Sequence, residues 1–434
     1  MTGSEHVSKT PRPRNSAGLT NRYALYVLAL LTALNFLNYV DRQVITSMYQ
    51  DLRAHFGFDD GQIGMFSSAF FIVHAMTTVP FGWAADNYDR RRIMAGAVLV
   101  WSAATLGSAY AIGFLSMLTL RSFVGVGEAA YGPVANAVIA ESFPADRKAR
   151  VIAIFNGGMF AGACVGIYMG AQLGYPRSFL YVGYPGIVLG LLAWNLRIKP
   201  RREEGPRKPY PGFFKVVKQS WASIDVPTLR WMVIAGVLIS FAVGGYVTWF
   251  IDFVTRYKHV QKEQAANIYG FIAISGGTCG VIAGGRVADW LQRHRPDGRV
   301  LTIAIGFFLS VPFGIGAVYL PNGTAFYISS WLMMFFIPWY NGPMAAVIDD
   351  VVDDDKASTA QASFTFFLHL LGSGMAPAVV GNLAKLIGLQ HALMLPTACI
   401  VASAIICLVA ARHVGADMRA RDERAAARAA VALS

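Results

Sequence analysis

The chain has 434 residues, of which 55% are hydrophobic and only 14% are charged, and its mean hydropathy is +0.45. A soluble protein carries about 25% charged residues, so this composition excludes a soluble globular protein and indicates an integral membrane protein. The net charge of +12 does not indicate nucleic-acid binding, because the basic residues gather in a few short segments between apolar stretches.

Twelve apolar stretches follow one another along the chain, and each has about the 20 residues that a helical bilayer span requires. A β-barrel would instead show ~10-residue segments of alternating polarity. We therefore predict an all-α integral membrane protein with twelve transmembrane helices, at 23–50, 62–86, 92–112, 115–142, 149–172, 176–196, 229–255, 265–290, 299–320, 325–348, 358–384 and 391–412.

The longest break in hydrophobicity, at 197–228, divides the spans six and six. The predicted organisation is an N-terminal tail at 1–22, a six-helix bundle at 23–196, a linker at 197–228, a second six-helix bundle at 229–412 and a C-terminal tail at 413–434. The polar N-terminus lacks the pattern of a cleavable signal peptide. The Ala/Arg-rich C-terminal tail is either a short basic helix at the lipid surface or a disordered segment.

Basic residues concentrate in the two tails, in the linker and in every second loop. Because basic loops stay on the cytoplasmic side, we expect both termini and the linker to be cytoplasmic, in a multi-pass protein of the cell inner (plasma) membrane.

Span 1 carries ionisable residues at a depth where each costs about 2.5–3.5 kcal/mol on insertion scales. Asn35, Asn38 and Arg42 recur at i, i+3 and i+7 and so share one helix face, with Asp41 beside them. Span 4 runs in the opposite direction and carries Arg121 and Glu128 at overlapping depths. Two acidic and two basic side chains are therefore expected to lie close together between spans 1 and 4.

A carboxylate beside a guanidinium can take up a proton when a substrate disturbs the pair. We therefore predict that Asp41, Arg42 and Glu128 couple transport to protons, and that Arg42, Asn35, Asn38 and Arg121 contact substrate. The alternative is that Arg42 and Glu128 only pin the first span to the fourth.

The loops after spans 2 and 8 repeat one motif, Gly82-Trp-Ala-Ala-Asp86 with Arg90 and Gly285-Arg-Val-Ala-Asp289 with Arg293. Such an internal repeat indicates two related bundles with a site between them. We expect Arg90 to pair with Glu141 or Asp146, and Arg293 with Asp349 or Asp350, when the cytoplasmic face is shut. The predicted cytoplasmic gate comprises Gly82, Asp86, Arg90, Arg91, Glu141, Asp146, Asp289, Arg293 and Asp349.

Glycines 158, 162 and 166 are spaced by four in span 5, which predicts close packing against another helix. In the second half, aromatic residues and one histidine near mid-depth are predicted to line an apolar half of the cavity: Tyr246, Trp249, Trp339, Tyr340, Phe366 and His369. His74 in span 2 is interpreted as a core histidine.

Twelve spans in two sets of six, a basic central loop and the motif Gly82-x-x-x-Asp86-x-x-x-Arg90-Arg91 resemble the major facilitator superfamily. The chain departs from that motif at Asn87 and Asp89. Across about 34–156, Asn38-Tyr39-Val40-Asp41-Arg42 and the segment from Arg121 to Ala129 are similar to the spinster family of lipid transporters. That resemblance implies proton coupling and head-group contact for Asp41, Arg42 and Glu128.

The leading hypothesis is a proton-coupled secondary transporter, working by alternating access, for an anionic amphipathic lipid of the lysophospholipid or sphingoid-phosphate type. The alternative is a proton-coupled symporter of sugar acids or other organic anions. An enzyme is disfavoured because no nucleophile, metal or phosphate-loop motif is present, and a channel because no filter-like loop is present. We expect no cofactor, no metal, no nucleic-acid partner and a monomer in the bilayer.

Overall fold

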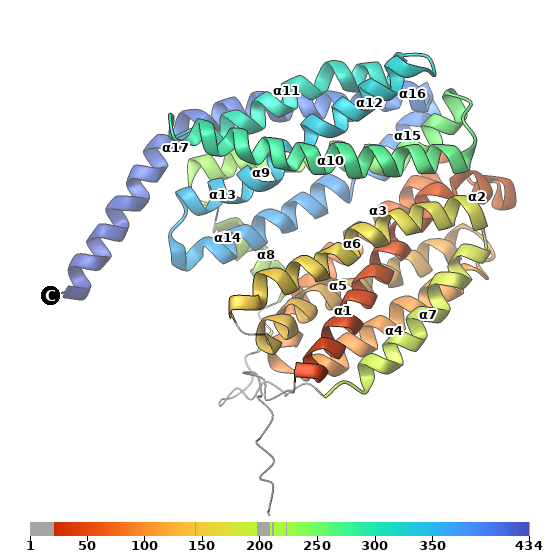
Figure 1. The fold of residues 1–434 in the computed structure, drawn as a ribbon, viewed down its shortest axis with the longest axis horizontal. Coiled ribbons are helices and arrows are strands. Elements are labelled where there is room, and N and C mark those ends of the chain that lie inside the picture. The colour runs from red at the N-terminus through yellow and green to blue at the C-terminus, as the bar shows by residue number, and fades with distance from the viewer. Residues whose placement is uncertain (1–20, 144, 198–208, 211, 223, 434) are drawn as a thin grey trace, which may run out of the picture.

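The computed structural model describes residues 21–143, 145–197, 209–210, 212–222 and 224–433. The predicted N-terminal tail therefore lies almost wholly outside the described residues. Within this part of the chain the fold is all-α, with twelve spans that form two bundles of six (Figure 1). Nine of the described helices are long and apolar enough to cross a membrane on composition alone. The shorter or more charged helices α4, α5 and α7 complete the twelve.

The first bundle, drawn in red to yellow in Figure 1, is formed by α1 (Asn21–Val44), α3 (Asp60–Asn87), α4 (Arg90–Ser108), α5 (Phe114–Ser142), α6 (Ala145–Leu173) and α7 (Arg177–Trp194). The predicted first span at 23–50 ends early. After Val44 the chain continues through a 3₁₀ turn, η1 (Ile45–Ser47), into the short helix α2 (Tyr49–Phe56). Thr46 and Ser47 donate hydrogen bonds to the carbonyls of Gln43 and Val44, so their side chains compete with further α-helix formation.

The second bundle, drawn in green to blue, contains six spans of which two are interrupted. The interruptions are the 3₁₀ turn η2 (Ile337–Tyr340), which contains Pro338, and the π-helical segment η3 (Leu368–Ser373). The spans are α9 (Pro227–Tyr257), α10 (Lys262–Gln292), α11 (Gly298–Tyr319), α12 (Thr324–Phe336) with η2 and α13 (Asn341–Val351), α14 (Asp354–Phe367) with η3 and α15 (Ala376–Ile387), and α17 (Met394–Leu433), which follows the one-turn helix α16 (Leu389–Ala392).

The structure adds detail in two regions, the linker and the C-terminal tail, the latter predicted as either a short basic helix or a disordered segment. The linker contains a helix, α8 (Phe213–Ala222), which lies between the bundles at the end opposite α2. The C-terminal tail continues the last span as one helix, α17, because its alanines and arginines are strong helix formers. Arg424 and Arg428 of this tail bind the carboxylate of Asp353 at 2.9 and 2.8 Å. We call the two ends of the molecule the α2 side and the α8 side.

Helices α1 and α6 pack closely along a stripe of glycines, as the spacing of Gly158, Gly162 and Gly166 predicted. A Cβ atom at Gly162 would overlap the carbonyl group of Phe36, and one at Gly166 would overlap Val40. Gly170 continues the same contact. Glycine thus lets the α6 backbone approach the helix that carries Asn35, Asn38 and Arg42.

We expect Gly162→Ala to destabilise the protein by about 1–3 kcal/mol, because the added methyl group forces α1 and α6 apart. Gly157→Ala is the matched control, since a Cβ atom there meets nothing within 4 Å. Thermal unfolding in detergent should show a lower Tm for Gly162→Ala only. Equal Tm values for the two variants would contradict this account of the stripe.

Candidate functional site

A cavity of about 910 Å³ lies between the two bundles and extends from the middle of the first bundle toward α8. Its first-bundle wall includes Asn35, Asn38, Arg42 and Glu128, and its second-bundle wall includes Phe366 and His369. Val216 and Ser220 of α8 line the cavity at the α8 side. The polar face predicted for span 1 therefore lies on the wall of a central cavity.

Arg42 and Glu128 form an ion pair at the inner end of this cavity. The Nε and Nη2 atoms of Arg42 donate to Oε2 of Glu128 at 3.2 and 2.9 Å. The Glu128 side chain is buried, whereas 17% of the Arg42 side chain remains exposed. The rings of Tyr39 and Phe70 lie 4.9 and 5.2 Å from the Arg42 guanidinium carbon. The guanidinium of Arg42 thus lies between two aromatic rings and is partly exposed to the cavity.

The second carboxylate oxygen of Glu128, Oε1, is buried, and no described residue hydrogen bonds to it. Likewise, Nη1 of Arg42 donates to none of the described residues. A buried ion pair is favourable only when the remaining polar atoms are satisfied, so this pair is poised to exchange partners.

Asp41 and Arg121 form a second ion pair, at 3.0 Å, that is fully buried. Thr105 of α4 donates a hydrogen bond to the other carboxylate oxygen of Asp41. Phe70 also lies within 5.8 Å of the Arg121 guanidinium and therefore contacts both arginines. The four charged residues that the sequence singled out are thus brought together as two pairs, but Arg121 does not line the main cavity.

The second-bundle wall differs from the predicted apolar surface. Only Phe366 and His369 of the six predicted residues line the cavity. The other four pack inside the protein: Tyr246 bonds to Thr397, Trp249 donates to the carbonyl of Pro377, Trp339 contacts Phe335 and Phe336, and Tyr340 contacts Phe307. Hydroxyl and amide side chains occupy much of that wall instead, namely Ser358, Thr359, Gln361, Ser363 and Thr365.

His74 was interpreted as a core histidine, but it lines the cavity together with His369. The two residues come from α3 and from the π-helical segment η3, and so from different bundles. His369 Nδ1 lies 3.1 Å from the hydroxyl of Ser373, which holds the ring orientation. No feature of the sequence distinguished His74 from a buried histidine.

On the α8 side, the side chains of Asp86, Glu141 and Asp146 lie outside the described residues. Gly82 lines the cavity, Arg90 donates to the carbonyl of Ala85, and Arg91 contacts Asp89. Asp289, Arg293 and Asp349 are exposed.

The pairing of Arg293 with Asp349 or Asp350, which was predicted for a shut cytoplasmic face, stays a prediction, because the cavity reaches this side in the described conformation. Asp350 pairs with Arg299 at the start of α11, and Asp349 accepts a hydrogen bond from Gln361. Both contacts lie within the second bundle.

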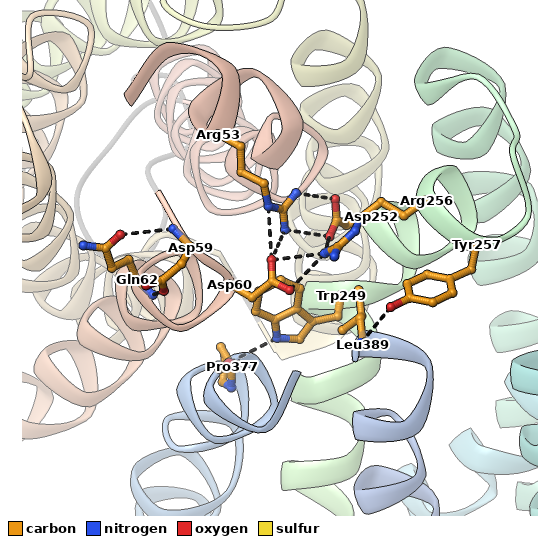
Figure 2. A network of polar contacts seen from close by, with 10 residues as sticks. All are labelled: Arg53, Asp59, Asp60, Gln62, Trp249, Asp252, Arg256, Tyr257, Pro377 and Leu389. Atoms are coloured by element: carbon orange, nitrogen blue, oxygen red, sulfur yellow. Dashed lines mark hydrogen bonds and ion pairs between the residues drawn. The ribbon is translucent and has the colours of Figure 1, made fainter. Parts of the chain in front are cut away.

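On the α2 side an ion-pair network that the sequence analysis missed joins the bundles (Figure 2). Arg53 binds both oxygens of Asp252, at 2.7 and 2.8 Å, and also contacts Asp60 at 2.6 Å. Arg256 bridges Asp60 and Asp252 at 3.0 and 3.3 Å. Arg53 and Asp60 belong to the first bundle, and Asp252 and Arg256 to the second. The network therefore closes the α2 side.

Further contacts surround this network. Lys262 binds Asp51 and Lys385 binds Asp59, each at 3.0 Å and each across the two bundles. Burial disfavours the charge on Asp59, but the Gln62 backbone N–H and the Lys385 ammonium outweigh it and lower the pKa of this carboxyl. Beneath the network, the Trp249 ring packs against Tyr49 with centroids 5.4 Å apart. The α2 side is thus sealed by ion pairs above and aromatic packing below.

Two helical bundles with a charged cavity between them, open toward one side and sealed at the other, define a transporter architecture. The sequence pattern of the Major Facilitator Superfamily matches residues 31–377, and the chain belongs to that superfamily. It is therefore a multi-pass membrane transporter and not an enzyme.

Within the superfamily the chain is similar to the spinster proteins. It is 26% identical to protein spinster homolog 1 of Mus musculus over 392 residues, which cover 84% of this chain and 74% of that protein. It is 24% identical to protein spinster of Drosophila melanogaster over 394 residues, which cover 87% and 64% of the two chains.

The fold resembles a crystal structure of a bacterial homolog of the human lysosomal transporter spinster in an inward-facing, unoccupied conformation. The TM-score is 0.75 at 22% identity, over 92% of this chain and 98% of that one. A nucleoside transporter structure resembles it with a TM-score of 0.73 at 12% identity, over 89% and 99% of the two chains.

We expect Asp252→Asn to shift the protein toward conformations open on the α2 side. The substitution removes one carboxylate from a partly buried network and leaves Asp60 as the remaining acidic partner of Arg53 and Arg256. Spin labels at Gln172 on α6 and Gln264 on α10, both exposed near that side, should report longer distances. Arg295→Gln is the control, because its pair with Asp297 lies within one bundle on the α8 side. An unchanged distance distribution in Asp252→Asn would show that the network is not a gate.

Proposed function

We propose that this protein is a proton-coupled secondary transporter that moves an anionic amphipathic lipid, of the lysophospholipid or sphingoid-phosphate type, by alternating access. The observation that carries the proposal is the position of Arg42, whose partly exposed guanidinium lies at the inner end of a cavity of about 910 Å³. This volume is near the upper end of the ~300–1,000 Å³ range of ligand pockets, so it suits a ligand with a chain as well as a head group.

The head group would bind at the inner end of the cavity. Arg42 can form a bidentate contact with a phosphate or carboxylate, and Asn35 and Asn38 lie on the same helix face. His74 and His369 stand on the wall nearby. The rest of the ligand would extend toward the α8 side along Val79, Phe155, Met159 and Phe366. A charged inner end with apolar groups along the path matches an amphiphile.

Proton coupling would follow from competition for Arg42. In the described state Glu128 holds the guanidinium through one oxygen. An anionic head group that draws Arg42 away would leave Glu128 as a buried carboxylate without a counter-charge. Such a group binds a proton rather than remain ionised in an apolar interior. Substrate and proton binding would then favour one another at a single pair.

We propose that the α8 side is cytoplasmic and that the protein resides in the cell inner (plasma) membrane. The support is the excess of arginine and lysine on this side, as in Arg92, Arg147, Arg150 and Arg295. The described conformation would then be inward-facing, with the Arg53 network as the closed outer gate.

The alternative substrate class, sugar acids or other organic anions, has one specific observation in its favour. The second-bundle wall carries Ser358, Thr359, Gln361, Ser363 and Thr365, which can hydrogen bond to ligand hydroxyl groups. A thermal-shift screen against lysolipids, sphingoid phosphates and sugar acids, repeated on Arg42→Ala, discriminates the two. Stabilisation by sugar acids alone would replace the lipid proposal.

We expect Glu128→Gln to abolish uptake driven by a pH gradient in liposomes while leaving the fold intact. Glutamine retains the shape and a hydrogen-bonding oxygen for Arg42 but cannot exchange a proton. Thermal unfolding checks the fold, and Gln361→Glu, which places a carboxyl elsewhere on the wall, is a control for charge in the cavity. Uptake at the wild-type rate by Glu128→Gln would overturn the coupling role of this residue.

We expect Arg42→Lys to lose most of its affinity for an anionic ligand, on the order of tenfold or more. Lysine keeps the charge but cannot form the bidentate contact or stack as a planar group on Tyr39 and Phe70. Ligand affinity is measured at several pH values. Near-wild-type affinity across the series would exclude Arg42 as the head-group ligand and leave it as a partner of Glu128.

A further inference from the structure

Helix α8 forms part of the wall of the central cavity, although it belongs to the linker between the bundles. Val216 and Ser220 line the cavity on its inner face. The Phe213 ring lies 6.2 Å from that of Phe366, and the Trp221 ring lies 5.6 Å from that of Phe367. The helix also contacts α3 of the first bundle. It therefore bridges the two bundles at the α8 side of the cavity.

The outer face of α8 is apolar and basic. Phe214 is 86% exposed and its ring faces away from the protein, and Trp221 is 60% exposed although its ring also contacts Phe367. At 100° per residue these rings lie on one flank of the helix, since they are seven residues apart. Lys218 follows on the adjoining flank and Lys215 beyond it, and both are exposed. The segment from Phe213 to Ala222 contains no acidic residue.

We propose that α8 docks onto the bilayer leaflet of its own side by binding anionic lipid head groups, and that this docking holds the cavity wall formed by Val216 and Ser220. Phe214 and Trp221 enter the boundary between head groups and acyl chains, where aromatic rings are favoured. Lys215 and Lys218 contact lipid phosphates, and the absence of acids on the helix makes its charge complementary to an anionic surface.

The lipid surface is favoured over a protein partner by the way the helix is placed. Val216 and Ser220 face the cavity, and the rings of Phe213 and Trp221 contact the second bundle. Phe214, Lys215 and Lys218 are exposed, and the helix lies at the end of the spans where other exposed basic residues of the α8 side, such as Arg92, also lie. A helix with these flanks lies in the plane of the interface.

Hydrogen–deuterium exchange of the full protein in lipid nanodiscs tests the proposal. The wild-type protein is reconstituted in phosphatidylcholine alone and in phosphatidylcholine mixed with phosphatidylglycerol. Backbone amides of 213–222 should exchange at least about fivefold more slowly in the anionic discs, as expected for a lysine near an anionic surface. Because both leaflets carry the same lipid, the result does not depend on the orientation of the protein or on its transport substrate.

The double substitution Lys215→Gln and Lys218→Gln should remove the effect of lipid charge. Lys356→Gln is the matched control, an exposed lysine on the same side but outside α8, and should retain the wild-type difference. In the Phe214→Ser variant the backbone amides of 213–222 should exchange faster in both kinds of disc. The Phe214 ring makes few contacts with the protein, so its loss acts through the contact with lipid.

Exchange of 213–222 that is equal in neutral and anionic discs would overturn the proposal. So would a full difference that persists in the double lysine variant. An anionic lipid that acts from inside the cavity gives a different pattern, because Arg42→Ala would then abolish the difference. Retention of the difference in Arg42→Ala supports docking at the surface.

Discussion

The interaction on which the rest of the site depends is the pairing of four charged side chains within one apolar bundle. An unpaired charge at that depth is costly, so Asp41 must lie beside Arg121 and Glu128 beside Arg42. These pairs hold α1 against α5 and so decide which face of α1 borders the cavity. Removing one member of the Asp41–Arg121 pair would leave the other as an uncompensated buried charge, whereas Arg42 is partly exposed to the cavity.

The two pairs are not equivalent, and the difference lies in how completely each carboxylate is satisfied. Both oxygens of Asp41 have partners, from Arg121 and Thr105, and the pair is sealed from the cavity. Glu128 uses one oxygen for Arg42, while the other has no partner among the described residues. The Asp41 carboxylate is therefore held more completely than that of Glu128, although Nε of Arg121, like Oε1 of Glu128, is buried without a partner among the described residues. A coupling role for Asp41 stays a prediction, and Glu128 is the one of the two acids that lines the cavity.

The residues that could be predicted from the sequence are those whose placement in the membrane costs free energy, such as charged side chains within the spans. Hydropathy located the twelve spans, and the spacing of Asn35, Asn38 and Arg42 located the face that lines the cavity. Aromatic residues carry no such cost, so nothing in the sequence separated Phe366, on the wall, from Trp249 or Trp339, in the core. Phe213, Val216 and Val217 recur at the helical spacing of apolar residues, which could have indicated α8 within the linker.

The ion-pair network at the ends of the spans could not be predicted from the sequence, for a different reason. Arg53 and Asp252 are 199 residues apart, and each taken alone resembles a solvated residue at a loop. Only the approach of the two bundles turns them into a buried network.

The two bundles contribute different groups to the cavity wall, and the regularity of their helices differs as well. The first bundle supplies the charges from regular helices held closely, as where α1 meets the glycines of α6. The second bundle supplies the wall from an irregular span, since His369 lies in the π-helical segment η3 and Gly372 packs against α9. A π-helical turn is less stable than an α-helix and frequently marks a functional position. The same span continues into α15, which packs on α3 beside the closed α2 side. A change in η3 on ligand binding would therefore be transmitted along one helix from the cavity to the seal.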